Sequence, residues 1–308
     1  FDTYSPVTKI STIRMMFALT SIHNMHVHQM DVKTAFLYGD LDEEIYMTQP
    51  PGYVEPGFEH KVCKLRKSLY GLKQAPRAWY SIIETYFLGA GFKRNNHEHT
   101  LFIKMVENEI LIVNLYVDDL IYVNSSSQLI EEFKISMKSE FKMTDFGKMR
   151  YFLGVEIVQD DDGIFISQQK YAREILKKFN LMECNFVRNP MVPGTRLTKS
   201  GDEVAVSPTE YKQLIGSLLY MTATRPDIMY SVCTLIRYME APTRQHILAA
   251  KRVMRYLKGT LNFGIWYKRK EGEQNLIGYT NSDYTGDLDD RKSTSGYLFF
   301  LAGGVVSW

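Results

Sequence analysis

Two adjacent aspartates, Asp118 and Asp119, interrupt the apolar run ILIVNLYVDDLIYVN at residues 110–124. The residues on both sides are mostly β-branched, leucine or aromatic, and each stretch has the length of one strand. Neighbouring side chains on a strand point to opposite faces, whereas a turn lets both carboxylates approach one point. The sequence therefore predicts a tight β-hairpin with two acids at its tip.

Carboxylates that lie this close repel each other, and one takes up a proton unless a cation lies between them. A hard divalent ion such as Mg²⁺ prefers carboxylate oxygens, water and substrate phosphates. Aspartate is also a common turn residue, so the VDD motif alone favours the plain structural interpretation. A metal site requires a further acid at the end of another strand.

Asp31 supplies such an acid, because it lies at the end of the predicted strand VHQMDV, residues 27–32. Its alternative role is to cap the turn that follows. Three strand-end carboxylates can hold two metal ions about 4 Å apart, which stabilise the attacking and leaving oxygens in phosphoryl transfer. Phe36, five residues after Asp31, is placed to form an aromatic wall that excludes a 2′-hydroxyl and favours deoxyribose.

Positive charge is concentrated in two segments, although the net charge is only +2. Residues 61–80, KVCKLRKSLYGLKQAPRAWY, and residues 241–270 carry six and eight Lys or Arg and no acid. Either segment forms a solvated face or a phosphate-binding surface, and charge alone leaves both open. In the first segment Gly71 allows close backbone approach, and the helix that follows can direct its first amides at phosphate.

The remaining patterns predict an α+β fold. Apolar residues after Pro76 recur at helical spacing up to Phe87, and YFLGVEIVQDDDGIFISQ at 151–168 predicts a hairpin at its Asp-Gly turn. A linker rich in Pro, Gly and Ser at 189–206 precedes three predicted helices. Strands resume at 263.

The third of those helices, residues 243–258, is amphipathic. Its apolar stripe predicts a buried face, and its basic residues lie on another face: Lys251, Arg252, Arg255 and Lys258. As in the first basic segment, this face is either solvated or binds phosphate.

Neither membrane insertion nor secretion is expected. No apolar run approaches the roughly 20 residues that span a bilayer, and the N-terminus has no signal-peptide pattern. Cys63, Cys184 and Cys233 lie far apart without zinc or disulfide spacing, which favours a reducing, intracellular compartment. The sequence gives no indication of the oligomeric state.

Acid, aromatic, basic loop and acidic hairpin follow one another in a specific order, together with motifs further along the chain. The motifs are YSPVTKISTIR, QMDVKTAFLYGDLDEEIYMTQPPGY, KLRKSLYGLKQAPRAWY, LYVDDLIYV, FKMTDFGKMRYFLGVEI, YKQLIGSLLYMTATRPDI and DRKSTSGY. With these seven motifs in this order, the chain resembles the reverse transcriptase of Ty1/copia-type retrotransposon polyproteins over essentially its whole length.

The resemblance implies a right-hand polymerase palm with truncated fingers in residues 1–188. It further implies a linker and helical thumb/connection region in 189–262 and the first strands of an incomplete ribonuclease H-like sheet in 263–308. From this likeness we expect the basic face of helix 243–258 to follow the template-primer backbone, with binding that depends on salt and not on base sequence. YFLGVEI resembles the primer grip. The implied activity is RNA-directed DNA synthesis by a transposable element, part of a cycle that ends in DNA integration. A cytoplasmic particle or the nucleus is the implied compartment.

The resemblance also implies site residues and partners. Asp31 and Asp118 would bind two Mg²⁺ ions, or Mn²⁺ in their place, while Asp119 assists. Phe36 would be the steric gate on the sugar, and three further residues would contact the incoming nucleotide: Tyr70, Gly71 and Lys73. The implied partners are an RNA template, a DNA primer and a dNTP, whose α-phosphate the primer 3′-hydroxyl attacks.

Two departures from the family pattern lower the expected activity. Asn281 stands where the ribonuclease H motif has its first metal-binding aspartate, so ribonuclease H activity is not expected. The chain also starts after the fingers and has the features of a fragment of a longer polypeptide. One alternative is therefore a catalytically dead nucleic-acid-binding remnant of such an element. A carboxylate-pair hydrolase such as a glycosidase is another, but it leaves the basic segments unexplained.

Overall fold

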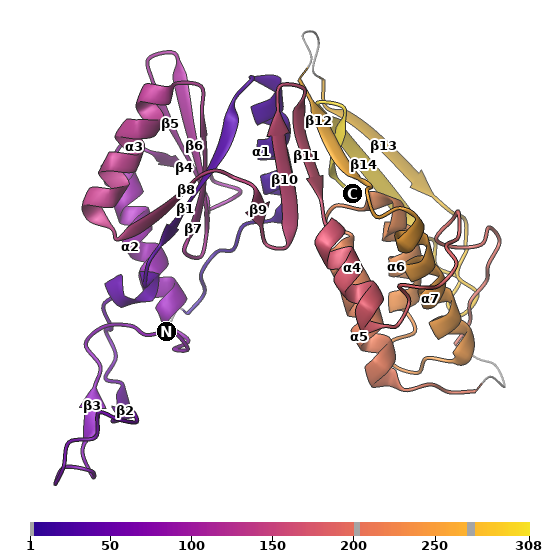
Figure 1. The fold of residues 1–308 in the computed structure, drawn as a ribbon, viewed down its shortest axis with the longest axis horizontal. Coiled ribbons are helices and arrows are strands. Elements are labelled where there is room, and N and C mark those ends of the chain that lie inside the picture. Colours follow the sequence, from indigo (N-terminus) through magenta and orange to yellow (C-terminus); the bar gives the residue numbers. More distant parts are fainter. Residues whose placement is uncertain (1–2, 200–203, 270–274) are drawn as a thin grey trace. The chain divides into compact units, whose positions relative to one another are not determined.

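The computed structural model describes residues 3–199, 204–269 and 275–308, which form a mixed arrangement of helices and several sheets (Figure 1). This mixture confirms the predicted combination of helices and strands. The chain divides into two compact units, Phe1–Ile13 with Met25–Met149, and Arg14–Asn24 with Arg150–Trp308. The first unit ends at Met149, whereas the first predicted region extends to residue 188. The functional limits 1–188, 189–262 and 263–308 stay predictions.

The first unit is built on a six-stranded sheet in which all neighbouring strands are antiparallel. The order is β4 (Lys93–Arg94), β5 (Leu101–Val106), β6 (Glu109–Tyr116), β7 (Asp119–Asn124), β1 (His26–Val32) and β8 (Met143–Lys148). The hairpin predicted in the apolar run is confirmed, because only Val117 and Asp118 lie between β6 and β7.

Helices α2 (Ala75–Gly89) and α3 (Ser127–Glu140) pack on one face of this sheet (Figure 1). Their buried side chains contact alternate residues of the central strands, including Met30 and Leu120. Because side chains alternate along a strand, the residues between these core positions lie on the opposite face. The acids of β1 and β7 are therefore directed away from the α2–α3 core.

Two short strands, β2 (Tyr46–Thr48) and β3 (Val62–Lys64), form a separate arm that extends from the sheet (Figure 1). The Gln49 side chain organises the Pro/Gly-rich loop between them, since its Nε2 donates to the carbonyl oxygens of Phe58 and Lys61. A two-stranded hairpin has too little apolar surface to be stable alone. These polar bonds help to hold the arm in one conformation.

A four-stranded antiparallel sheet opens the second unit. Its order is β12 (Gly264–Lys268), β11 (Gly163–Ser167), β10 (Val155–Asp160) and β9 (Tyr151–Phe152). The hairpin predicted at the Asp-Gly turn is confirmed as β10–β11. Strand β12 was expected to begin the third region, but it covers the free edge of β11, so one sheet joins strands from the first and third predicted regions.

The helices of the second unit share one hydrophobic core. They are α4 (Gln169–Lys178), α5 (Pro208–Met221), α6 (Met229–Ile236) and α7 (Arg244–Gly259). The three predicted helices after the linker are thus present, and the chain turns between α5 and α6 at the short η2 (Pro226–Ile228). The buried Arg225 at this turn is satisfied by a two-pronged ion pair with Asp227 and by the carbonyl oxygen of Thr260.

A three-stranded antiparallel sheet ends the chain, with β13 (Ile277–Ser282), β14 (Ser295–Leu301) and β15 (Gly304–Ser307). Helix α1 (Ile10–Ile22) lies at the other end of the sequence and is divided between the two units at Ile13. Over the ranges that the structure describes, no helix combines the length and the apolarity needed to cross a bilayer.

Candidate active site

The structure brings Asp31 and Asp119 opposite each other on neighbouring strands. They are partners in the antiparallel register of β1 with β7, and directly opposite residues have their Cβ atoms about 4.5–5.5 Å apart on the same face. Asp118 lies in the two-residue turn that precedes β7, and its carbonyl oxygen accepts a hydrogen bond from Val32 N at 2.9 Å. The three acids thus form one cluster at one end of the central strand pair.

The cluster has few positive neighbours. Among the described residues, none of the three acids takes part in an ion pair. Burial, and next to it the charge of Asp118, raises the pKa of Asp31, while Lys33 opposes this shift only in part. The electrostatic environment therefore favours either a proton or an added cation.

Asp119 has a raised pKa for the same reasons. Burial is the largest cause, and the charges of Asp118 and Asp31 act in the same direction. The Gln29 side chain opposes the shift, because its Nε2 donates to Asp119 Oδ1 at 2.9 Å. Gln29 lies two residues before Asp31 on β1, so both side chains are on the same face of the sheet.

The chemistry of this donor set fits a hard divalent cation, since it offers carboxylate oxygens that repel one another. The side chains do not yet form a closed ligand shell. Within the described ranges no three His, Cys, Asp or Glu side chains converge as a metal-binding group. Asp119 Oδ1 instead accepts the hydrogen bond from Gln29. The strand register places Asp31 opposite Asp119, and the convergence of all three carboxylates on metal ions stays a prediction.

The turn that carries Asp118 is strained. Val117 has a φ of 58°, in the left-handed region that β-branched residues rarely adopt. Such a conformation costs about 1–3 kcal/mol and persists only where surrounding contacts enforce it. Strain of this kind is concentrated at functional sites. Val117 shares a positive φ with other described residues, including Thr34 and Thr285, and it is the one that adjoins the acidic cluster.

The predicted sugar wall and nucleotide pocket lie on adjoining segments. Phe36 is part of the short helix η1 (Ala35–Tyr38), and its ring centroid is 5.9 Å from that of Tyr70. Ser68 connects the two segments, because its Oγ donates to the carbonyl oxygen of Phe36 and its amide donates to Gly39. The structure therefore brings Phe36 and Tyr70 together, and the Tyr70 side chain is 90% exposed.

Gly71 and Lys73 follow Tyr70 in the same loop. Gly71 has a φ of 98°, and a Cβ atom at this position would meet no neighbouring atom, so backbone conformation and not space requires glycine here. Lys73 is exposed and has no ion pair among the described residues. In the same basic segment Lys67 pairs with Asp40 at 2.6 Å, and Lys64 pairs with Glu44. Part of this charge is thus neutralised within the protein, and Lys73 is not.

The basic residues of α7 have an intramolecular role that the sequence did not reveal. Arg255 Nε and Lys258 Nζ donate to the carbonyl oxygens of Asn185 and Cys184, at 2.7 and 2.5 Å. Arg252 donates to the Asn189 side chain. Three of the four basic residues assigned to nucleic acid therefore hold the segment 184–189 on the helix. Binding of nucleic acid by this face stays a prediction.

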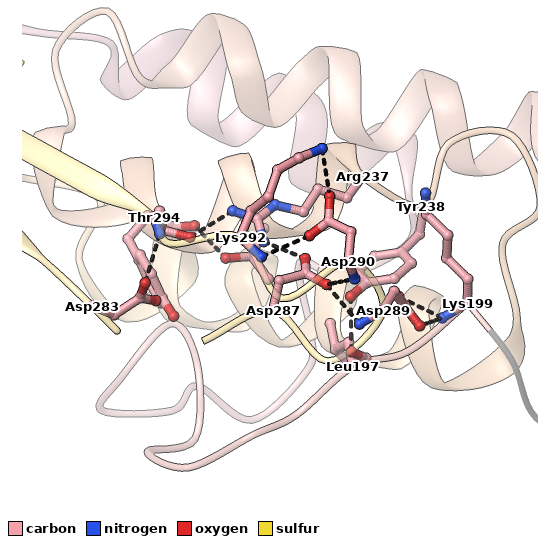
Figure 2. A network of polar contacts seen from close by, with 12 residues as sticks. Leu197, Lys199, Arg237, Tyr238, Asp283, Asp287, Asp289, Asp290, Lys292 and Thr294 are labelled. Atoms are coloured by element: carbon pink, nitrogen blue, oxygen red, sulfur yellow. Dashed lines mark hydrogen bonds and ion pairs between the residues drawn. The ribbon is translucent and has the colours of Figure 1, made fainter. Parts of the chain in front are cut away.

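A second acidic cluster lies in the loop between β13 and β14 (Figure 2). Here each carboxylate has a partner: Asp287 pairs with Arg237 at 2.6 Å, Asp290 pairs with Lys292 at 2.8 Å, and Asp289 accepts from Lys199 N. Asp283 Oδ1 accepts from Thr294 N at 2.6 Å. Asn281, which stands where the ribonuclease H motif has an aspartate, pairs with Gly296 between β13 and β14.

Sequence analysis missed two residues at the first cluster. Gln29 was part of a quoted motif, but its bond to Asp119 depends on how two distant strands align. The two-residue period of β1 was the available signal, because it places Gln29 beside Asp31. Trp79 is one of the apolar residues after Pro76 whose spacing predicted the helix, yet its Nε1 donates to the carbonyl oxygen of Val117 at 2.6 Å. No local pattern indicates that bond.

Comparison with known proteins finds similar sequences over the whole chain. Residues 1–193 match the family described as reverse transcriptase (RNA-dependent DNA polymerase). The whole chain is 38% identical to the retrovirus-related Pol polyprotein from transposon RE1 of Arabidopsis thaliana and 38% identical to that from transposon TNT 1-94 of Nicotiana tabacum. It spans 21% and 24% of the lengths of these relatives.

A shorter relative matches over most of its length. The putative transposon Ty5-1 protein of Saccharomyces cerevisiae is 33% identical over 281 residues, which are 91% of each chain. The family match covers more than half of the present chain and includes both strands of the acidic cluster. The chain therefore belongs to the reverse transcriptase (RNA-dependent DNA polymerase) family of Ty1/copia-type transposon Pol polyproteins.

Proposed function

We propose that this chain carries out RNA-directed DNA synthesis as part of a longer transposon polyprotein. The observation that carries the proposal is the register of Asp31 with Asp119, next to Asp118 in a strained turn. The raised pKa values of Asp31 and Asp119 support it, because an acid cluster whose members form no ion pair among the described residues favours an added cation. The proposed partners are an RNA template, a DNA primer and dNTPs.

In this proposal Asp31 and Asp118 would hold two Mg²⁺ ions, or Mn²⁺ in their place, with Asp119 assisting, and the ions would offset phosphate charge during nucleotidyl transfer. The chain's other residues bind and orient the reactants. Phe36 and Tyr70, whose rings are in contact, would flank the sugar of the incoming nucleotide. Gly71 offers an unobstructed backbone, and Lys73 offers an unpaired cation to the triphosphate. The rate gain then comes mainly from positioning and from charge stabilisation.

The finer architecture is also part of the proposal. We assign the six-stranded sheet with α2 and α3 to the palm, and α5–α7 to the thumb/connection region. The sheet β13–β15 is assigned to the start of a ribonuclease H-like domain. The free, widely separated cysteines Cys63, Cys184 and Cys233 support a reducing intracellular compartment. Exposed basic residues of the loop 66–73 support contact with phosphate.

Primer extension tests the activity. A labelled DNA primer on an RNA template is incubated with the protein, dNTPs and Mg²⁺ or Mn²⁺. The proposal expects extension that Asp118→Asn abolishes and Asp290→Asn leaves intact, because Asp290 already has the internal cation Lys292. Template binding without extension by the wild-type protein would instead identify a catalytically dead nucleic-acid-binding remnant.

Sugar selection provides a second test of the same site. Replacing Phe36 by Val keeps an apolar side chain but removes the ring that contacts Tyr70. We expect incorporation of ribonucleotides to increase relative to deoxyribonucleotides, while Phe58→Val in the β2–β3 arm leaves the ratio unchanged. An unchanged ratio in Phe36→Val would remove Phe36 from the proposed nucleotide pocket.

A further inference from the structure

The strained turn at Val117 is held from outside by one side chain. Trp79, on α2, donates its indole Nε1–H to the carbonyl oxygen of Val117 at 2.6 Å. That oxygen belongs to the peptide group that joins Val117 to Asp118. A hydrogen bond that fixes the direction of this carbonyl group therefore fixes the orientation of the Val117–Asp118 peptide group.

The donor itself has little freedom to move. Trp79 is only 1% exposed, and its ring packs edge-on against Phe141, with centroids 5.4 Å apart, and beside Tyr38. An indole nitrogen can only donate, and a buried donor without an acceptor is costly, so the ring gains by keeping this bond. The bond thus connects a rigid helix to a turn that would otherwise relax.

We propose that Trp79 is a positioning residue for the acidic turn. Its indole holds Val117 in the left-handed conformation, so that Asp118 is already oriented for a cation before the cation binds. The inference rests on the proposed function, because it assigns a purpose to the turn of that site. Trp79 also packs in the aromatic cluster, and the positioning role is distinct from this packing role. Only the positioning role depends on residue 117 having a strained backbone.

Four variants separate these roles. Trp79→Phe removes the N–H donor and keeps an aromatic ring. Phe141→Leu is the matched control, because it disturbs the same aromatic cluster and leaves the indole bond in place. Val117→Gly removes the strain, since glycine adopts a positive φ readily. The double variant Trp79→Phe/Val117→Gly completes the cycle.

The first measurement is Mn²⁺ binding to the full chain, followed by electron paramagnetic resonance of the free ion. We expect Trp79→Phe to weaken binding about tenfold, which is about 1.4 kcal/mol and the size of one hydrogen bond. Phe141→Leu should stay within about twofold. In the Val117→Gly background the same Trp79→Phe change should weaken binding by less than about threefold, because no strained residue remains to be held.

The second measurement does not depend on metal or on synthesis. In protein labelled with ¹⁵N-tryptophan, the three indole signals include one that Trp79→Phe removes. We expect this signal to exchange slowly with solvent and its exchange to stay slow in Phe141→Leu. Melting of the metal-free variants should show the same reduced effect of Trp79→Phe in the Val117→Gly background.

Several results would overturn the inference. They are fast exchange of the Trp79 indole, an equal loss of Mn²⁺ affinity in Phe141→Leu, or a Trp79→Phe loss of the same size in both backgrounds at position 117. If the wild-type chain neither binds Mn²⁺ nor extends primers, the proposed function fails. The indole exchange and the metal-free melting cycle then still decide whether Trp79 holds the turn.

Discussion

The two acidic clusters of this chain contain the same residue type in opposite electrostatic settings. Asp31, Asp118 and Asp119 lie on adjacent strands without an ion pair among the described residues, and the pKa values of Asp31 and Asp119 are raised. In the loop between β13 and β14, Asp287 and Asp290 pair with Arg237 and Lys292 (Figure 2). The first cluster lacks a cation, and the second supplies its own.

The pKa shifts follow from this difference. Burial by itself would raise the pKa of Asp287, but the amides of Asp289 and Asp290 and the guanidinium of Arg237 outweigh it, and the pKa is lowered. Of the residues that the structure describes, only Lys33 lowers the pKa of Asp31, and it does not outweigh burial and the charge of Asp118. The comparison shows that a local density of acids predicts neither a metal site nor a solvated loop. The partners that the fold places around the acids decide between the two.

The largest expected effect separates the clusters by activity. Asp31→Asn should reduce primer extension by at least about a hundredfold, because it removes a charge from the proposed two-metal site. Asp287→Asn should leave extension within about twofold. Both rates are measured at saturating Mg²⁺ on the same RNA–DNA hybrid. Equal losses in the two variants would show that the clusters do not differ in function.

A smaller effect is expected on stability in the second cluster. Arg237→Ala leaves Asp287 without its cation and should cost about 1 kcal/mol, seen as a melting temperature lower by about 2–4 °C. The lowered pKa of Asp287 gives stability that is present above the unfolded value near 4 and is lost as pH falls through the folded value. The deficit of Arg237→Ala should therefore shrink below about pH 4. Lys212→Ala serves as the control, because Lys212 is exposed on α5 and makes no ion pair among the described residues.

The stability contributed by the first cluster should depend on pH with the opposite sign. Because the folded-state pKa of Asp31 is raised, its contribution to stability is largest at low pH and is lost as pH rises through that pKa. Asp31→Asn should raise the metal-free melting temperature at pH 7 by about 1–2 °C, a modest gain because Asp31 is partly screened by solvent. The gain should vanish below about pH 4, where Asp31 is protonated. A lower melting temperature at pH 7 would contradict the assignment of repulsion at this site.

The smallest expected effect concerns Gln29. Gln29→Met removes the donor to Asp119, so the pKa of Asp119 should rise further and metal binding should begin at a higher pH. We expect the midpoint of Mn²⁺ binding against pH to move upward by less than about one unit. Gln128→Met on α3, whose side chain donates to Glu132 and not to an acid of this cluster, should not move it. A downward shift would mean that Gln29 mainly competes with the metal for Asp119.

Much of the acidic site was predictable from local rules. The β-branched residues around Asp118 predicted the hairpin, and the alternation of neighbouring side chains along a strand agrees with the burial of Met30 beside the partly exposed Asp31. Helix α2 starts next to Pro76 and includes Phe87, as the helical spacing predicted. These features depend on neighbours in sequence, and such patterns determine strand and helix positions directly.

Other features depend on which distant backbone groups a side chain meets. The amphipathic pattern of α7 was correct, yet Arg255 and Lys258 contact carbonyl oxygens about seventy positions away, and no pattern indicated that. The pairing of β12 with β11 was also unexpected, because an edge strand accepts any partner that the chain brings to it. In both cases the partner is a backbone group, and because every residue carries such groups, the sequence does not identify the partner.

The sequence by itself determined that acids would be carried on a strand end and on a tight turn, because side-chain periodicity and turn preference are local properties. Only the tertiary structure decided that Asp31 lies opposite Asp119, that Gln29 occupies one carboxylate oxygen, and that Trp79 holds the turn. Strand register and the packing of α2 set these contacts. Both result from burying one continuous core, to which residues from the whole first unit contribute.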